Sequence, residues 1–476
     1  MTRGVPRVTL ADMTSTLGSG LDILRSSIDG QLSAPGSADY DEVRRVWNGD
    51  IDRRPAVIVR CASASDVALA VEFGVARGLE IAVRGGAHSM SGASTVDDGL
   101  VIDLSPLNRV SVDPVAKLVR VGGGALLSDL DAATQEHGLA VPSGMISHTG
   151  VGGLTLGGGM GWLTRLGGLS IDNLVSAEVV TADGSVLRAS ADEHADLFWA
   201  IRGGGGNFGV VTEFEFRLHE VGPIVHLGFL FWGLEQGAQV LRLAREVIPG
   251  LDRRLNVLIA GLNAPPAPFV PEQYQGQPGY ALLVTGFDSA EQHAEVVAGI
   301  RAELPPLVEF VTPMPFVAVQ QLFDEADAWG MHCYEKSAYL DEITDGAIEV
   351  ITEQVPLRSS PLSVMLFYRL DGAYSEVGEE DTAFSGRRTP KYAVFMVGVC
   401  PEPELLAADR AWARSCWEAL RPHTPSVGCY INALTEQDES RVHAAYGEAK
   451  YERLARIKSS YDPGNVFHRN LNIKPG

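Results

Sequence analysis

The chain has 476 residues, of which 45% are hydrophobic and 21% charged, a balance typical of a globular protein with two or three domains. Its formal net charge of −22 at pH 7 argues against a nucleic acid or an anionic membrane surface as a partner. No window approaches about 18 consecutive apolar residues, so we expect no membrane partner.

The N-terminus and the cysteines bear on the cellular compartment. Residues 1–23 lack the long apolar run and the small-residue cleavage site of a signal peptide. The cysteines are odd in number and scattered, which indicates reduced thiols rather than a disulfide framework. They are Cys61, Cys333, Cys400, Cys416 and Cys429. We therefore expect a cytoplasmic protein.

The first hundred residues alternate between helix and strand patterns. Residues 1–36 are small and polar and are predicted to be a surface lead-in, with a short helix over 21–28. Apolar residues at helical spacing follow Ser65, and either Ser63 or Ser65 could cap that helix. The sequence predicts helices over 39–47 and 65–75 and strands over 56–61 and 79–83.

The second of these strands leads into V-R-G-G-A-H-S-M-S-G at 83–92. Gly85 and Gly86 let the backbone approach a ligand closely, and successive N–H groups in such a turn can bind phosphate. Arg84 would add a cation, and His88 would stand at the rim. Taken alone, a histidine in such a loop is more often a hydrogen-bonded turn residue.

Glycine-rich segments further along the chain imitate a dinucleotide-binding fingerprint without meeting its requirements. After strands over 100–104, 109–113 and 117–121, three glycines precede a helix over 125–136, but Leu127 replaces the third motif glycine. The spacing G-x-G-x-x-G does occur from Gly204 to Gly209. There a helix precedes the glycines and a strand follows them, the reverse of the required order.

Residues 144–168 form a second glycine-rich run in which apolar residues are interleaved. A flexible surface loop would leave those apolar side chains in water. Backbone wrapped closely around a large ligand explains both features better. Strands over 174–181 and 185–189 follow, and Asp183-Gly184 predicts a hairpin between them.

Gly222-Pro223 marks a plausible boundary, after which strands and helices alternate as in a sheet covered by helices. The chain then ends in a predicted helix over 438–461 and an apolar, amide-rich stretch. We expect this stretch to be ordered by packing against the rest of the protein. Strands are predicted over 225–231, 255–262, 280–285, 362–370 and 392–399, and helices over 237–247, 290–304, 341–353 and 403–420.

Five ordered motifs resemble the flavin-linked oxidases of the vanillyl-alcohol-oxidase type, in the berberine-bridge-enzyme-like branch. They are R-G-G-A-H at 84–88, G-V-G-G-L-T-L-G-G-G-M-G-W-L at 150–163, G-L-S-I-D-N-L at 168–174, L-F-W-A-I-R-G-G-G-G-N-F-G-V-V at 197–211 and Y-D-P-G-N-V-F-H-R-N-L-N-I at 461–473. The chain looks most similar to bacterial members that tailor natural products, as in enterocin biosynthesis.

The resemblance implies an α+β, two-domain, PCMH-type FAD-binding fold. An FAD-binding domain would span residues 1–222, with its core at about 50–222. A substrate-binding domain of antiparallel sheet covered by helices would span 223–430, and a C-terminal segment, 431–476, would return to the FAD domain.

The resemblance also implies the cofactor site, with the 8α-methyl of FAD bonded covalently to His88. Residues 85–89 would hold the pyrophosphate and the isoalloxazine, Val211 would pass the adenine end, and Asn470 would touch the ring region. The cofactor-binding residues expected are Arg84, Gly85, Gly86, Ala87, His88, Ser89, Gly92, Gly144, His148, Thr149, Gly150, Gly152, Gly153, Gly158, Gly161, Trp162, Asn173, Val211, Asn470 and Asn472.

Two departures from the family pattern matter. Many relatives carry a second flavin link from a cysteine, but Ile146 aligns with that position, so a single link is expected. Plant-type relatives carry a catalytic tyrosine where this chain has Ala433. The base is therefore open, and the candidates are Tyr339, Tyr368, Tyr430 and Asn432, although for each of them a role as a core or interface packing residue is favoured. Lys336 is either a pocket cation or a surface charge.

The resemblance implies that a substrate C–H beside oxygen or nitrogen is oxidised and that O₂ is reduced to hydrogen peroxide. Thr149 occupies the family's oxygen-gate position, although a plain packing role is equally open. A sugar oxidase, an O₂-avoiding dehydrogenase and a non-catalytic flavin-binding relative remain alternatives. No metal site is expected, because H-E-x-x-H is absent, and G-x-S-x-G is absent too. The chain is expected to be a monomer or a homodimer that binds a small organic substrate.

Overall fold

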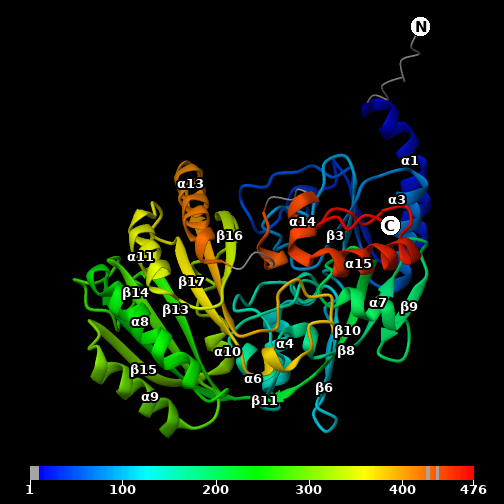
Figure 1. Ribbon diagram of the computed structural model, residues 1–476. Helices are drawn as coiled ribbons and strands as arrows, with labels where there is room; N and C mark the ends of the chain where they lie inside the picture. Colours follow the sequence, from blue (N-terminus) through cyan, green and yellow to red (C-terminus); the bar gives the residue numbers. More distant parts are fainter. Residues whose placement is uncertain (1–9, 425–428, 436–438) are drawn as a thin grey trace.

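A computed structural model describes residues 10–424, 429–435 and 439–476. The chain forms two lobes, one with a four-stranded and a five-stranded sheet and one built on a seven-stranded sheet (Figure 1). Helices accompany all three sheets, so the predicted α+β class is confirmed. Residues 1–9 of the lead-in predicted over 1–36, and the first residue of the helix predicted over 438–461, lie outside the described residues.

The four-stranded sheet delivers the loop that contains His88. Its order is β1-β2-β4-β3, in which β2 (Val57–Arg60), β4 (Leu100–Asp103) and β3 (Ile81–Arg84) are parallel and β1 (Gln31–Ser33) is antiparallel to β2. Helix α3 (Ala64–Ala76) connects β2 to β3, and the Ser63 hydroxyl caps it by accepting the backbone N–H of Asp66. Apolar side chains of these elements share one core.

The N-terminal helix α1 (Leu10–Ser27) is much longer than the helix predicted over 21–28. The glycines in this segment disfavour an isolated helix, which explains the short prediction. In the folded protein Leu24 packs into the core of the four-stranded sheet, and Gly20 lies against the Arg77 side chain. Tertiary contacts therefore override the local preference. Helix α2 (Tyr40–Val43) is shorter than the helix predicted over 39–47.

The five-stranded sheet is antiparallel, in the order β5-β6-β10-β8-β9. Side chains of α4 (Leu127–Gln135), α7 (Ala195–Ile201) and α15 (Glu448–Tyr461) share its core. The strands are β5 (Val110–Asp113), β6 (Leu118–Gly122), β8 (Leu174–Val180), β9 (Val186–Ser190) and β10 (Val210–Arg217), and a separate pair joins β7 (Leu139–Ala140) to β11 (His219–Glu220).

The C-terminal stretch is ordered against this core, as its sequence predicts. The predicted single helix is two helices, α14 (Glu439–Tyr446) and α15, because Gly447 between them has a φ of 73°. In the last turn of α15, the buried Lys458 ammonium lies 2.6 Å from the carboxylate of Asp462, which follows the helix. The side chain of Asn207 donates to the carbonyl of Leu471, which ties the tail to the loop before β10.

The seven-stranded sheet is antiparallel and is buried on both faces. Its order is β15-β12-β14-β13-β17-β18-β16. The two edge strands, β15 and β16, were not predicted from the sequence. Helices α8 (Gly237–Val247), α9 (Ala290–Glu303), α11 (Asp345–Gln354) and α13 (Pro403–Leu420) cover one face (Figure 1). The strands are β12 (Ile224–Gly233), β13 (Leu255–Asn263), β14 (Pro278–Gly286), β15 (Val308–Pro315), β16 (His332–Leu340), β17 (Val364–Leu370) and β18 (Lys391–Cys400).

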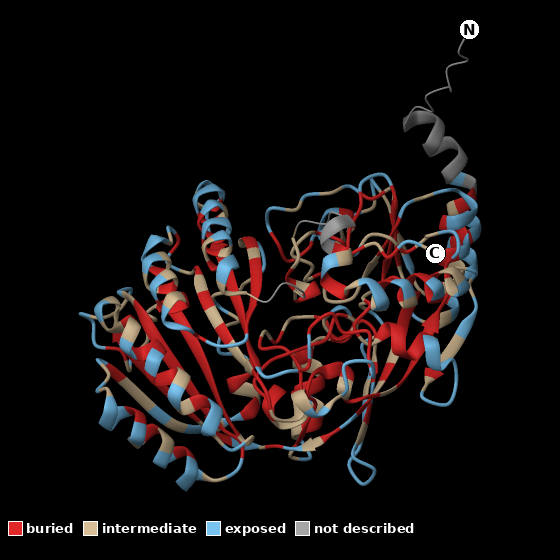
Figure 2. Cartoon of the chain, in the orientation of Figure 1, coloured by how far each residue is buried: buried red, intermediate tan, exposed pale blue. Residues whose placement is uncertain are grey.

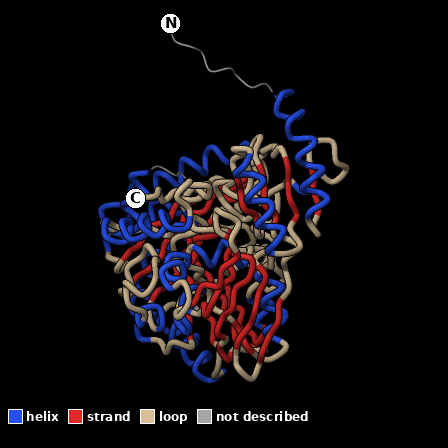
Figure 3. Tube along the Cα trace, turned by 90° about the vertical axis from the view of Figure 1, so that its right-hand side faces the viewer, coloured by secondary structure: helices blue, strands red, loops and turns tan. Residues whose placement is uncertain are grey.

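Successive residues of these strands contribute to different cores. Leu230 and Trp232 pack under the helices, whereas Phe229 and Phe231 pack with Trp162 of the other lobe. The face away from the helices is therefore the one that meets the first lobe, and buried residues are concentrated there (Figure 2). Figure 3 shows the strands from a direction at right angles to that view. Among the described helices, none is long and apolar enough to cross a membrane.

Candidate active site

A cavity with a volume of about 410 Å³ lies between the two lobes. Glycine-rich backbone from residues 85–91, 144–156 and 204–211 lines one side of it. The facing surface comes from β16, β17 and β18, and residues 430–434 close one end. The two glycine-rich runs and the C-terminal stretch singled out in the sequence therefore meet at one place.

Two of the lining glycines pack backbone to backbone. A Cβ built on Gly86 would lie 2.2 Å from the backbone nitrogen of Gly150, and a Cβ on Gly150 would lie 2.3 Å from that of Gly86. A side chain at either position would force the two loops apart. Gly153 is different, because a Cβ there would meet nothing within 4 Å and the residue lines the cavity. Because Gly153 has no side chain, its backbone forms part of the cavity surface. We call this glycine-lined surface the floor of the cavity.

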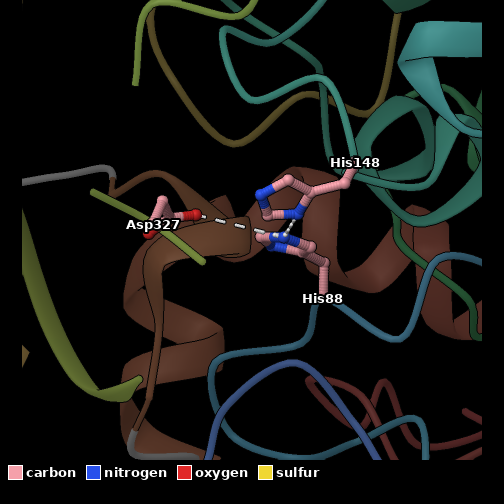
Figure 4. A group of neighbouring side chains, drawn as sticks. All are labelled: His88, His148 and Asp327. Atoms are coloured by element: carbon pink, nitrogen blue, oxygen red, sulfur yellow. Dashed lines mark hydrogen bonds and ion pairs between the residues drawn. The ribbon is translucent and has the colours of Figure 1, made fainter. Parts of the chain in front are cut away.

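The imidazole of His88 lines the same cavity and lies between the indole of Trp47 and a second imidazole. Figure 4 shows the second imidazole, His148, and the nearby Asp327. Trp47 stacks on the His88 ring, with ring centroids 4.3 Å apart and planes inclined by 17°. Its Nε2 lies 2.8 Å from Nδ1 of His148 and 4.0 Å from a carboxylate oxygen of Asp327. Burial, and then the neighbouring His148, lower the pKa of His88 well below its ordinary value. The ring is therefore neutral at pH 7, and one of its nitrogens carries a lone pair.

The segment before β16 in the second lobe holds this cluster in place. Asp324 accepts hydrogen bonds from the backbone N–H and the hydroxyl of Ser147, at 2.8 and 2.5 Å. The Trp47 indole donates to the carbonyl of Asp327 at 2.6 Å. Burial raises the pKa of Asp327 well above its ordinary value, and the nearby charge of Glu335 adds to the shift. The protonated form of Asp327 is therefore favoured.

The donor atoms of His88, His148 and Asp327 lie within 4.8 Å of one another, a spacing that a metal ion could bridge. An ion needs only those three ligands. It does not need the open glycine floor beside them or the stacked indole. We therefore interpret the cluster as the rim of a site for a large planar ligand.

The structure separates the predicted cofactor residues into two groups. Twelve line the cavity: Gly85, Gly86, Ala87, His88, Ser89, Gly144, Thr149, Gly150, Gly152, Gly153, Val211 and Asn470. The others lie behind the lining: Arg84, Gly92, His148, Gly158, Gly161, Trp162, Asn173 and Asn472.

Several residues of the second group have contacts that explain their position. Arg84 donates to a backbone carbonyl and lies 4.0 Å from Asp103, so it braces the loop and is not the cation expected at its entrance. The side chain of Asn173 donates to two loop carbonyls and holds a turn. Trp162 is buried and stacks on Phe323, whose ring does line the cavity.

Three of the four base candidates line the cavity, namely Tyr368, Tyr430 and Asn432, whereas Tyr339 is buried behind the lining. The Asn432 amide and the N–H of Gly159 both donate to the Tyr430 hydroxyl, at 3.0 and 3.2 Å. Burial raises the pKa of Tyr430 to about 12 and that of Tyr368 further still. Both phenols are therefore neutral at pH 7 and are poor proton acceptors there.

One acidic residue of the lining was not predicted from the sequence. Glu335 on β16 is half-buried and lines the cavity, and burial, with no hydrogen bond or charged partner, accounts for the state of its carboxylate within the described part of the chain. Burial raises its pKa to about 8. Its neighbour Lys336 points to the opposite face of the strand, with its ammonium 5.4 Å from the Trp417 ring of α13. Lys336 is therefore not the pocket cation considered from the sequence.

The rest of this wall is apolar. Val364 on β17 pairs with Val397 on β18, and Leu366 pairs with Phe395, so these side chains form rows on one face of the sheet. Leu362 and Val399 extend the rows. Asp327 and Glu335 are the acidic residues among the described lining residues, and no lysine or arginine is found among them.

Comparison with known proteins gives two family matches. Residues 55–190 match the family described as an FAD binding domain, and residues 429–474 match the family described as berberine and berberine like. An FAD-linked oxidoreductase of Dictyostelium discoideum is 32% identical over 451 residues, which cover 94% of this chain and 95% of the relative. The (R)-6-hydroxynicotine oxidase of Paenarthrobacter nicotinovorans is 32% identical over 470 residues, or 94% and 97% of the two chains.

Solved structures of the same kind share the whole fold. The crystal structure of 6-hydroxy-D-nicotine oxidase from Arthrobacter nicotinovorans has a TM-score of 0.80 and 28% identity, covering 94% of this chain and 99% of the other. Glucooligosaccharide oxidase from Acremonium strictum has a TM-score of 0.81 and 24% identity, over 96% and 99%. The latter is described as carrying a 6-S-cysteinyl, 8α-N1-histidyl FAD.

Proposed function

Since the chain belongs to the berberine-bridge-enzyme-like family of FAD-linked oxidoreductases, with the PCMH-type fold of that family, we propose that it is an O₂-using oxidase of a small organic substrate. The bond oxidised would be a C–H beside oxygen or nitrogen. In this proposal residues 1–222 and 431–476 bind FAD, and residues 223–430 bind the substrate.

The extent of the cavity is the main observation that supports the proposal. A single cavity runs from the glycine floor and His88 in one lobe to the apolar face of β17 and β18 in the other. A cofactor on the floor would thus share one cavity with a substrate on the opposite wall. Such closeness is what a direct transfer between two bound molecules requires.

The residues at the floor fit FAD. The packed pair Gly86 and Gly150 keeps two loops close, and Gly153 leaves room above the backbone for a flat ring. Val211 and Asn470 also line the cavity, so they would contact other parts of the same elongated molecule. When bound, FAD would accept a hydride from the substrate and pass the electrons to O₂, which yields hydrogen peroxide.

We infer that His88 is the residue that bonds to the flavin. Its ring is neutral, so a lone pair is available, and the Trp47 indole on one face and His148 at one nitrogen restrict its orientation. A second link is not expected. Ile146 lines the cavity where the doubly linked relatives carry a cysteine, and no described cysteine is among the lining residues.

The use of O₂ is proposed from Thr149, which lines the cavity next to Gly150. Its short side chain is compatible with O₂ reaching the ring. A dehydrogenase that avoids O₂ is the alternative that the sequence leaves open, and one structure with the same fold is described as having glucose dehydrogenase activity. Its 22% identity supports the fold alone.

For the substrate we favour an intermediate of bacterial secondary metabolism, as the likeness to enterocin-type tailoring suggests. The apolar rows on β17 and β18 suit such a molecule better than a sugar, whose hydroxyls would need many hydrogen-bonding partners. The purified protein should carry a yellow chromophore that stays with the protein after acid precipitation, and it should release peroxide with a substrate of this class. A chromophore that no substrate reduces would favour a non-catalytic flavin-binding relative.

A further inference from the structure

The wall that faces the proposed flavin site has a composition that restricts the substrate. Resting on the proposed function, we propose that the substrate is an apolar molecule with a protonated amine, and that Glu335 is the carboxylate that binds this amine. The apolar rows of β17 and β18 would hold the rest of the molecule.

The position of Glu335 is the first argument. It pairs across the sheet with Val397, which in turn pairs with Val364, so one carboxylate stands at the end of a row of aliphatic side chains. All three residues line the cavity. A ligand that lies along the row would therefore bring one end to the carboxylate while its body contacts methyl groups.

The surroundings of Glu335 are the second argument. The titratable groups that interact with it are Asp327 from the preceding segment, Cys333 on the same strand, Tyr368 from β17 and Tyr430, and His88 lines the same cavity. None of these groups supplies a positive charge at pH 7, since both phenols and the imidazole are neutral. Since its pKa is about 8, Glu335 is mostly protonated in the free protein at pH 7, and a ligand cation would stabilise the ionised carboxylate and release that proton. An anionic ligand would instead disfavour the ionisation of Glu335 and of Asp327.

The nearest basic residue of the strand does not change this conclusion. Lys336 follows Glu335 but lies on the other face of β16, over the rings of Tyr334 and Trp417. The net charge of −22 adds a long-range field that attracts cations to the protein. Local contacts and overall charge therefore favour the same ligand.

The test uses the flavin-loaded protein and three probes of nearly equal shape, benzylamine, benzyl alcohol and benzoate. Binding is measured by the change in the visible spectrum of the flavin, without turnover. Benzylamine should bind more tightly than benzyl alcohol by roughly tenfold or more, the usual effect of a hydrogen bond to a charged group. Benzoate should bind most weakly.

Glu335→Gln keeps the shape of the side chain and should remove the preference for the amine, while Glu335→Asp should keep part of it. Glu342→Gln, at an exposed position after β16, is the matched control and should behave as the wild type. Flavin content and melting temperature confirm that each variant is folded. Equal binding of the three probes, no binding of any of them, a preference for benzoate, or an amine preference that survives Glu335→Gln would overturn the proposal. Reaction of the reduced flavin with O₂ needs no substrate, so the oxidase proposal can hold even where this one fails.

Discussion

Nε2 of His88 lies 2.8 Å from Nδ1 of His148, and the other ring nitrogen of His148 is buried without a hydrogen-bond partner. One proton must lie between the two rings. If His88 donates it, Nδ1 of His88 keeps its lone pair and is the nucleophilic atom. The pair therefore explains how a neutral histidine could be oriented for attack.

Replacement of His88 tests the covalent link. In His88→Ala, FAD should still bind in the glycine-lined cavity, but acid precipitation should release it, and oxidation should be slower. Intact-mass measurement of the wild type should show one FAD attached. FAD that remains attached to His88→Ala would show that another residue forms the bond.

Replacement of His148 tests its influence on His88. His148→Ala removes the hydrogen-bond partner that selects the tautomer, so we expect incomplete covalent attachment with the cavity intact. The measurement is the fraction of protein carrying acid-stable flavin after incubation with FAD. His137→Ala, at an exposed histidine, is the control and should load fully. Equal loading of the two variants would show that His148 does not influence the covalent attachment of the flavin.

The glycines offer a pair of variants with opposite expectations. Gly86→Ala places a Cβ 2.2 Å from the backbone of Gly150, so we expect a loss of stability of at least about 1–3 kcal/mol, typical of overpacking, and low soluble yield. Gly153→Ala meets no protein atom within 4 Å and should fold normally, while binding FAD more weakly. Thermal unfolding and flavin content separate the two effects. A Gly153→Ala protein with full flavin would show that the floor lies elsewhere.

Much of the flavin-binding half could be predicted from the sequence because its signals are local. The run 83–92 contains a strand end, a glycine pair and one histidine in consecutive positions, and the structure keeps them together. The glycine excess at 144–168 likewise has a local cause. The packing of Gly86 against Gly150 shows that close approach to other backbone accounts for part of that excess.

Glu335 could not be predicted, because the relevant information is not local. The strand H-C-Y-E-K-S-A-Y-L is covered on both faces and lacks a clear alternation of polar and apolar residues. Whether Glu335 or Lys336 faces the cavity depends on the pairing of Glu335 with Val397, a distant residue in the chain. A shift of one residue would exchange the two side chains. The break at Gly447 was missed for a simpler reason, since helical spacing continues across it.

The raised pKa of Glu335 predicts a pH dependence. Its folded-state pKa is about 8, above its ordinary value, so the folded protein holds a proton that the unfolded chain has lost between roughly pH 4.5 and 8. The contribution of this residue to stability therefore falls as the pH rises through that window. Glu335→Gln lacks the titration, and its melting temperature should rise relative to the wild type from pH 5 to pH 8. A constant difference would place the carboxylate in a water-like environment.

The central claim is that the cavity holds a flavin that reacts with O₂, and the most direct measurement needs no substrate. The flavin is reduced by light under anaerobic conditions and mixed rapidly with air-saturated buffer, while its absorbance and the peroxide formed are recorded. We expect prompt reoxidation with one peroxide for each flavin. Reoxidation over minutes would contradict it and would identify the protein as a dehydrogenase.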